Sequence, residues 1–212
     1  MITDTTTRSA SSDYVLVHPL IVRATHWINA LVILIMILSG WRIYNASPIF
    51  DFKFPNGITL GGWLGGALQW HFAAMWLLVL NGFVYLCYGV VSGRFKSRFF
   101  PIAPRALFND ILDALHGKLA HHDLTVYNTA QRGAYVAVIF CAIVLVLSGL
   151  AIWKPVQMQE LTALCGGFMG ARIVHFIAMA LLALIVVAHI TMVILVPRTF
   201  PIMITGRTRR SS

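Results

Sequence analysis

The sequence predicts an all-α integral membrane protein, a bundle of four transmembrane helices. Of its 212 residues, 58% are hydrophobic and only 11% are charged, whereas soluble domains contain about 25% charged residues. The apolar residues gather in four runs, each with the roughly twenty residues that a helix needs to cross a hydrocarbon core of about 30 Å. A lipid-exposed backbone must satisfy its own hydrogen bonds, which favours helices. The predicted spans are Ala24–Tyr44, Trp70–Val91, Gln131–Trp153 and Arg172–Val196.

These helices form one domain over residues 18–200, between a polar tail (1–17) and a basic tail (201–212). The first connection contains a glycine cluster, Gly61, Gly62, Gly65 and Gly66, which predicts a turn and a close-packed start of the second helix. The inner connection, between the second and third helices, is long. Its stretch Pro104–Leu119 predicts an amphipathic helix on the membrane surface. The apolar face of that helix comprises Leu107, Ile111, Leu112, Leu115 and Leu119.

The net charge of +9 follows the predicted topology. With the N-terminus placed inside, twelve of the 16 Lys and Arg residues fall in inner segments. Because Lys and Arg in short loops set orientation, both termini are expected in the cytoplasm. The charge is therefore attributed to membrane topology and lipid contact, and no nucleic-acid partner is expected. The four outer basic residues are Arg42, Lys53, Lys154 and Arg172.

Four of the eight histidines lie in apolar helices, where ionisable groups are costly and usually functional. His175 and His189 are fourteen residues apart, so they share nearly one helix face and are separated by about 21 Å along the axis. His71 begins the second helix from the outer side, at the depth of His175. His26 begins the first helix from the inner side, at the depth of His189. The depths predict two pairs, one outer and one inner.

Two imidazoles that face each other at one depth suit the two axial positions of a haem iron. The pattern therefore predicts two b-type haems, held without covalent attachment because the three cysteines form no CxxCH motif. Each histidine alone is also compatible with helix packing, and a proton relay would not require pairing. A zinc site needs about four ligands at one point, whereas these histidines lie at two depths. The remaining histidines are expected to be solvated, with contact to quinone or protons as the alternative for the last two: His18, His116, His121 and His122.

Small residues are expected where a flat macrocycle meets a helix, and Gly40, Gly82 and Gly149 are candidates, with helix packing as the alternative. The first and third helices also share a similar run, Leu38-Ser39-Gly40-Trp41 and Leu147-Ser148-Gly149-Leu150. A weak internal repeat and packing alone explain this run equally well.

These residues resemble the prokaryotic cytochrome b561 family, over about Val17–Pro197. The resemblance rests on Arg23-Ala-Thr-His26-Trp27-Ile-Asn29, on Leu68-Gln69-Trp70-His71-Phe72 with Asn81-Gly82-Phe83-Val84-Tyr85, and on the His175/His189 pair. The family includes the di-haem subunits of formate dehydrogenases, nickel-iron hydrogenases and thiosulfate-reductase-type enzymes, and the last branch looks most similar. The resemblance implies a bacterial inner-membrane protein with His71 and His175 on an outer haem, and His26 and His189 on an inner one.

The resemblance also implies a quinone pocket beside the inner haem, with Asn128, Gln131 and His189 as candidates. Asn128 is equally suited to cap the third helix. Arg23 and Arg172 are candidates for contacts with haem propionates, and anchoring at the membrane interface is the alternative for both.

The function expected from these features is that of a non-catalytic subunit of a respiratory oxidoreductase complex. It would pass electrons between a periplasmic partner, of molybdopterin type or another oxidoreductase, and the quinone pool. The alternative is a self-contained superoxide:quinone oxidoreductase of the same family. A transporter or channel is the non-redox alternative, and it predicts no haem.

Overall fold

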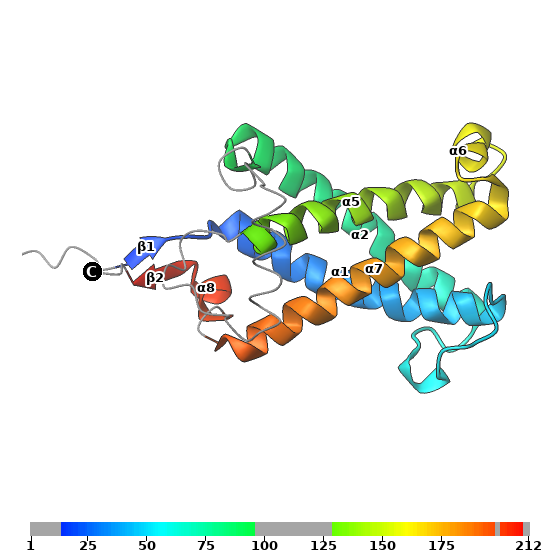
Figure 1. The fold of residues 1–212 in the computed structure, drawn as a ribbon, viewed down its shortest axis with the longest axis horizontal. Coiled ribbons are helices and arrows are strands. Elements are labelled where there is room, and N and C mark those ends of the chain that lie inside the picture. The colour runs from blue at the N-terminus through cyan, green and yellow to red at the C-terminus, as the bar shows by residue number, and fades with distance from the viewer. Residues whose placement is uncertain (1–13, 96–128, 198–199, 210–212) are drawn as a thin grey trace, which may run out of the picture.

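The computed structural model describes residues 14–95, 129–197 and 200–209 of the chain, and four long helices dominate it. All four are long and apolar enough to cross a membrane, so the predicted all-α membrane bundle is confirmed. The helices run roughly along the long axis of the molecule (Figure 1). Their bounds are α1 Leu20–Ala46, α2 Leu64–Val91, α5 Thr129–Trp153 and α7 Gly167–Leu195.

The bundle consists of two helix pairs, because α1 packs chiefly on α2 and α5 packs chiefly on α7. Large apolar side chains are exposed on every long helix, for example Leu34, Leu80, Phe140 and Leu184. In water such a surface would be unfavourable, but lipid tails solvate it. The exposed apolar surface therefore fits a protein surrounded by lipid.

The helices begin earlier than the hydropathy runs predicted, because backbone signals rather than apolar residues fix their starts. α1 begins directly after Pro19, whose φ of −57° already suits a helix. α2 begins at Leu64, six residues before the predicted Trp70, since the turn before it is made by Gly61 and Gly62 at positive φ. α7 begins after Gly166, which lies in the left-handed region.

One end of the bundle carries the connection between α1 and α2, which contains the 3-10 helix η1 (Asn56–Ile58), and the short helix α6 (Gln159–Leu164). This end is called the outer end, after the topology that the sequence predicts. The α1–α2 connection folds back over the bundle through tilted and edge-on contacts between aromatic rings. Phe52 lies 5.2 Å from Tyr44 of α1 and 6.1 Å from Phe176 of α7, measured between ring centres. This contact links the two helix pairs at the outer end.

At the opposite, inner end of the bundle, two segments that were predicted to be separate tails pair with each other. Strand β1 (Tyr14–Leu16) pairs antiparallel with β2 (Arg207–Arg209), and the short helix α8 (Phe200–Thr205) precedes β2. His18 was expected to be solvated, and this was wrong. It is 7% exposed, because its backbone and that of Val17 hydrogen-bond the Gly206 carbonyl and bring the C-terminal segment over it. The predicted amphipathic helix Pro104–Leu119, with His116, and the His121-His122 pair lie outside the described residues.

Candidate haem sites

The structure brings the outer histidines together. His71 lies near the start of α2 and His175 near the start of α7, and their ring centres are 6.5 Å apart with an interplanar angle of 59°. The starts of α2 and α7 lie at the end of the bundle that carries α6 (Figure 1). The two rings come from different helix pairs, so they face each other across the interface between the pairs.

The inner histidines meet in the same way at the opposite end. His26 lies near the start of α1 and His189 near the end of α7, with ring centres 6.0 Å apart and an interplanar angle of 69°. α7 therefore supplies one imidazole to each pair, as the fourteen-residue spacing on one helix face requires.

The ring separations fit imidazoles on opposite sides of one metal ion. Two metal–nitrogen bonds of about 2 Å, with roughly 1 Å from each nitrogen to its ring centre, place the ring centres about 6 Å apart. Among the residues that the structure describes, no group of three or more His, Cys, Asp and Glu side chains could hold a metal ion. The donor set is therefore a pair of imidazoles at each of two depths. Such a set suits iron that keeps its other ligands from a macrocycle.

A serine and a glycine of the neighbouring helix lie against each outer imidazole. Ser39 Oγ is 3.0 Å from His71 Nδ1, and Ser148 Oγ is 2.9 Å from His175 Nδ1. A Cβ at Gly40 would lie 3.5 Å from His71 Cε1, and one at Gly149 would lie 3.4 Å from His175 Cε1. The glycines of the repeated Ser-Gly run were predicted as candidates, but its serines were not assigned to histidines, although the repeat was the signal.

The inner site has a different support, which was also not predicted. Asn81 of α2 is buried and donates hydrogen bonds to the Thr25 carbonyl at 2.8 Å and to Asn29 Oδ1 at 2.7 Å. Both acceptors belong to the turn of α1 that carries His26. A lone polar residue in an apolar helix was the available signal. Gly82, the third candidate glycine, has no atom within 4 Å of a Cβ placed on it.

The two candidate arginines bind backbone carbonyls at opposite ends of the bundle. Arg23 donates from Nη1 to the Ile204 carbonyl of α8. Arg172 donates from Nη2 to the carbonyl of Ser47, the residue that follows α1. Each arginine therefore ties a chain end or a connection to a helix, and contact with propionates stays a prediction for both.

The quinone candidates receive little further support. Asn128 lies outside the described residues. Gln131 belongs to α5, but the structure does not describe its side chain. His189 is placed as one of the inner pair.

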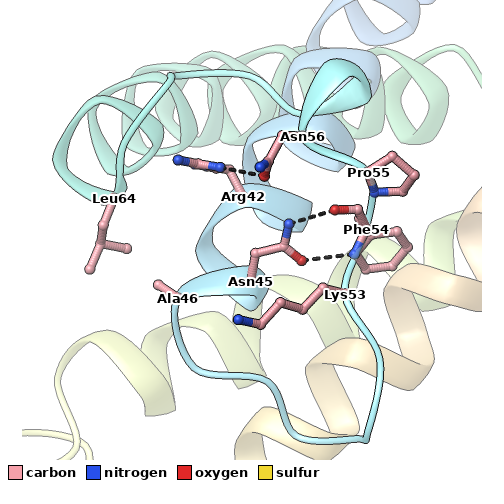
Figure 2. A pocket seen from close by; sticks show the side chains of 8 residues that line it. All are labelled: Arg42, Asn45, Ala46, Lys53, Phe54, Pro55, Asn56 and Leu64. Carbon is pink, nitrogen blue, oxygen red and sulfur yellow. Dashed lines mark hydrogen bonds between the residues drawn. The ribbon is translucent and has the colours of Figure 1, made fainter.

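A pocket of about 430 Å³ opens in the outer connection, and none of the four paired histidines lines it (Figure 2). Asn45 fixes one wall through two hydrogen bonds with the Phe54 backbone, of 2.8 and 2.9 Å, and Arg42 donates to Asn56 Oδ1 at 2.6 Å. Lys53 also lines the pocket. Two of the four outer cations therefore meet at this surface.

Comparison with known proteins agrees with this geometry. Residues 17–206 match the family described as prokaryotic cytochrome b561. The chain is also 54% identical over 196 residues to the putative protein-methionine-sulfoxide reductase subunit YedZ1 of Azospira oryzae. That match covers 92% of this chain and 99% of the relative.

Proposed function

Because this chain belongs to the prokaryotic cytochrome b561 family, whose members are haem b membrane electron-transfer proteins, we propose that it is a di-haem subunit that passes electrons between an oxidoreductase partner and the membrane quinone pool. The observation that carries this proposal is that four imidazoles form two facing pairs, with ring centres 6.5 Å apart in one pair and 6.0 Å apart in the other. His71 and His175 would hold the outer haem, and His26 and His189 the inner one.

The chemistry follows from what the four side chains occupy. A bound haem iron supplies reversible one-electron transfer. Two imidazoles would hold each iron and would leave no position for substrate at the metal, which suits electron transfer. The helices supply fixed ligand positions in a medium of low dielectric. The chain is therefore proposed to be an electron carrier rather than the catalytic subunit.

The proposed orientation places both termini in the cytoplasm of a bacterial cell and the outer pair near the periplasm. Support comes from the Lys and Arg distribution, with only Arg42, Lys53, Lys154 and Arg172 on the outer side. Reporter fusions after Arg209 should give cytoplasmic activity, and fusions at Gln157 should give periplasmic activity.

The proposed partner is a periplasmic reductase of the class that the YedZ1 name indicates, with a molybdopterin centre as one candidate cofactor. Reduction of methionine sulfoxide to methionine takes up two electrons and two protons and releases water. Oxidation of a quinol releases two electrons and two protons. Electrons would then flow from quinol at the inner face, beside Asn128, Gln131 and His189, to a partner docked on the outer connections.

Haem stoichiometry tests the proposal. The purified full chain should bind two haems, with a b-type α-band in its reduced-minus-oxidised spectrum. His71→Ala and His175→Ala should each lose one haem, and His26→Ala and His189→Ala should each lose the other. His116→Ala is the control and should retain both. One haem in the wild-type chain, or full haem content in all four variants, would refute the di-haem assignment.

Partner dependence separates the proposed role from the alternative within the family. A reductase that copurifies in equal amount and is reduced by quinol through this chain supports the subunit role. Quinone reduction by the purified chain alone, with superoxide as donor, would instead support the superoxide:quinone oxidoreductase.

A further inference from the structure

The outer imidazoles have hydrogen bonds whose direction can be assigned. Ser39 Oγ lies 2.6 Å from the Ile35 carbonyl, one turn earlier in α1, and 3.0 Å from His71 Nδ1. A serine hydroxyl has one proton, and a carbonyl can only accept. The close carbonyl therefore takes the hydroxyl proton, which leaves a lone pair of Oγ for His71. His71 Nδ1 must then carry its own proton and donate it.

Ser148 repeats this arrangement in the other helix pair. Its Oγ lies 2.6 Å from the Val144 carbonyl and 2.9 Å from His175 Nδ1. In each pair the hydroxyl thus favours the same tautomer, with the proton on Nδ1 and with Nε2 left to bind a metal.

Both serines are built into the helix interface. Ser39 is 0% exposed and Ser148 is 1% exposed, and both lie within long helices, α1 and α5. A buried hydroxyl is costly unless it is hydrogen-bonded, and each of these bonds both a helix carbonyl and an imidazole. The serine of the repeated run therefore has a histidine partner in each case, His71 for Ser39 and His175 for Ser148, which packing alone does not explain.

The inner pair lacks this support within the described part of the chain. Neither the His26 nor the His189 imidazole makes a side-chain hydrogen bond with another residue there. The two sites thus have the same pair of imidazole ligands and nearly the same ring separation. They differ in the hydrogen bond to the ring nitrogen that would not bind the metal, which only the outer imidazoles make.

We propose that Ser39 and Ser148 are positioning residues that hold His71 and His175 as Nδ1–H donors and thereby lower the midpoint potential of the outer haem. An imidazole whose N–H is hydrogen-bonded is a more basic ligand. A more basic ligand stabilises ferric iron more than ferrous iron, and the reduction potential falls. This inference rests on the proposed di-haem function.

The test is a spectroelectrochemical titration of the full-length chain with both haems bound, in the wild type and in Ser39→Ala, Ser148→Ala and the double variant. His71→Ala identifies the outer component, because it leaves only the inner one. Ser92→Ala is the matched control, since Ser92 also donates to a carbonyl four residues earlier, that of Tyr88, at the inner end of α2. Low-spin EPR spectra of the oxidised proteins report on the ring orientations independently.

Each single variant should retain both haems and raise the potential of the outer component only. The midpoint potential of the outer haem should rise by up to about 59 mV, which for one electron corresponds to a tenfold change in the ratio of reduced to oxidised haem at a fixed potential. The double variant should shift further, and Ser92→Ala should not shift. Ser39→Thr, which keeps a hydroxyl, should stay near the wild-type potential.

Three results would overturn the inference. The first is an unchanged potential of the outer component, and the second is an equal shift of both components. The third is loss of the outer haem from Ser39→Thr as well as from Ser39→Ala. Each would show that the hydroxyls do not tune the outer haem by accepting hydrogen bonds from its imidazoles. Wild-type protein with two titrating components but no serine effect overturns this inference alone. Wild-type protein with fewer than two haems overturns the di-haem function together with it.

Discussion

Asn81 of α2 holds the turn of α1 that begins at Thr25, the residue before His26. Its side-chain amide donates to the Thr25 carbonyl at 2.8 Å and to Asn29 Oδ1 at 2.7 Å. Asn81 is 6% exposed, so both donors of its amide are used inside the bundle. The position of His26 relative to α2 therefore depends on a polar contact, whereas most of the surrounding interface is apolar.

Replacing Asn81 with alanine should weaken the inner haem site. The substitution removes two interhelical hydrogen bonds, each worth about 0.6 kcal/mol in membrane proteins, so we expect a loss of about 1 kcal/mol in stability. The inner haem should dissociate at a lower denaturant concentration, with the outer haem unchanged. Absorbance of each haem during unfolding in a detergent gradient measures both effects.

Asn45→Ala is the matched control for this substitution. Asn45 also makes two hydrogen bonds through its amide, but to the Phe54 backbone at the outer end. It should loosen the outer connection (Figure 2) and leave the inner haem at its wild-type stability. If Asn45→Ala and Asn81→Ala released the inner haem equally, the specific role of Asn81 would be wrong.

The glycines beside the outer imidazoles should tolerate alanine but not a larger side chain. A Cβ at Gly40 or Gly149 would meet an imidazole at 3.5 or 3.4 Å, which is ordinary van der Waals contact. Alanine also improves helix propensity by up to about 1 kcal/mol. Gly40→Ala and Gly149→Ala should therefore retain the outer haem. Leucine at either position should displace the ring and abolish outer-haem binding, as measured by haem content.

Gly57 provides the control for the glycine substitutions, because a Cβ there meets no atom within 4 Å and its φ is not positive. Gly57→Leu should keep both haems. Loss of the inner haem rather than the outer one from Gly40→Leu would contradict the placement of Gly40 beside His71.

The features that the sequence predicted are those set by one helix at a time. Hydropathy locates four spans, and helical phase places His175 and His189 on one face at two depths. The pairing of rings then follows from depth alone, and the structure brings the same rings together. The role of these rings as haem ligands remains a proposal.

The features that the sequence did not predict depend on contacts between distant segments. The β1–β2 pair and the burial of His18 arise from a backbone pairing between chain ends, and strands of three residues are too short to have a distinctive pattern. Ser39 and Ser148 were visible as a repeat. However, a serine that bonds its own helix does not reveal which neighbouring side chain it faces.

The last prediction separates the two roles considered for Arg23. The structure shows its guanidinium donating to the Ile204 carbonyl, beside Trp27, whose indole donates to the Met203 carbonyl at 3.2 Å. If Arg23 acts by holding the C-terminal segment, its effect requires that segment. Arg23→Ala in the full chain should lower the stability of the inner haem site by about 1 kcal/mol, and a chain ending at Val196 should lose at least as much.

The double variant decides between the roles. Contacting groups give non-additive effects in a double-mutant cycle, and independent groups give additive ones. Arg23→Ala in the chain that ends at Val196 should therefore have no further effect on denaturant release of the inner haem. A full additional loss in the truncated chain would instead place Arg23 on a group other than the C-terminal segment, such as a haem propionate. Trp27→Phe, which removes the neighbouring donor to the same segment, should behave like Arg23→Ala in both backgrounds.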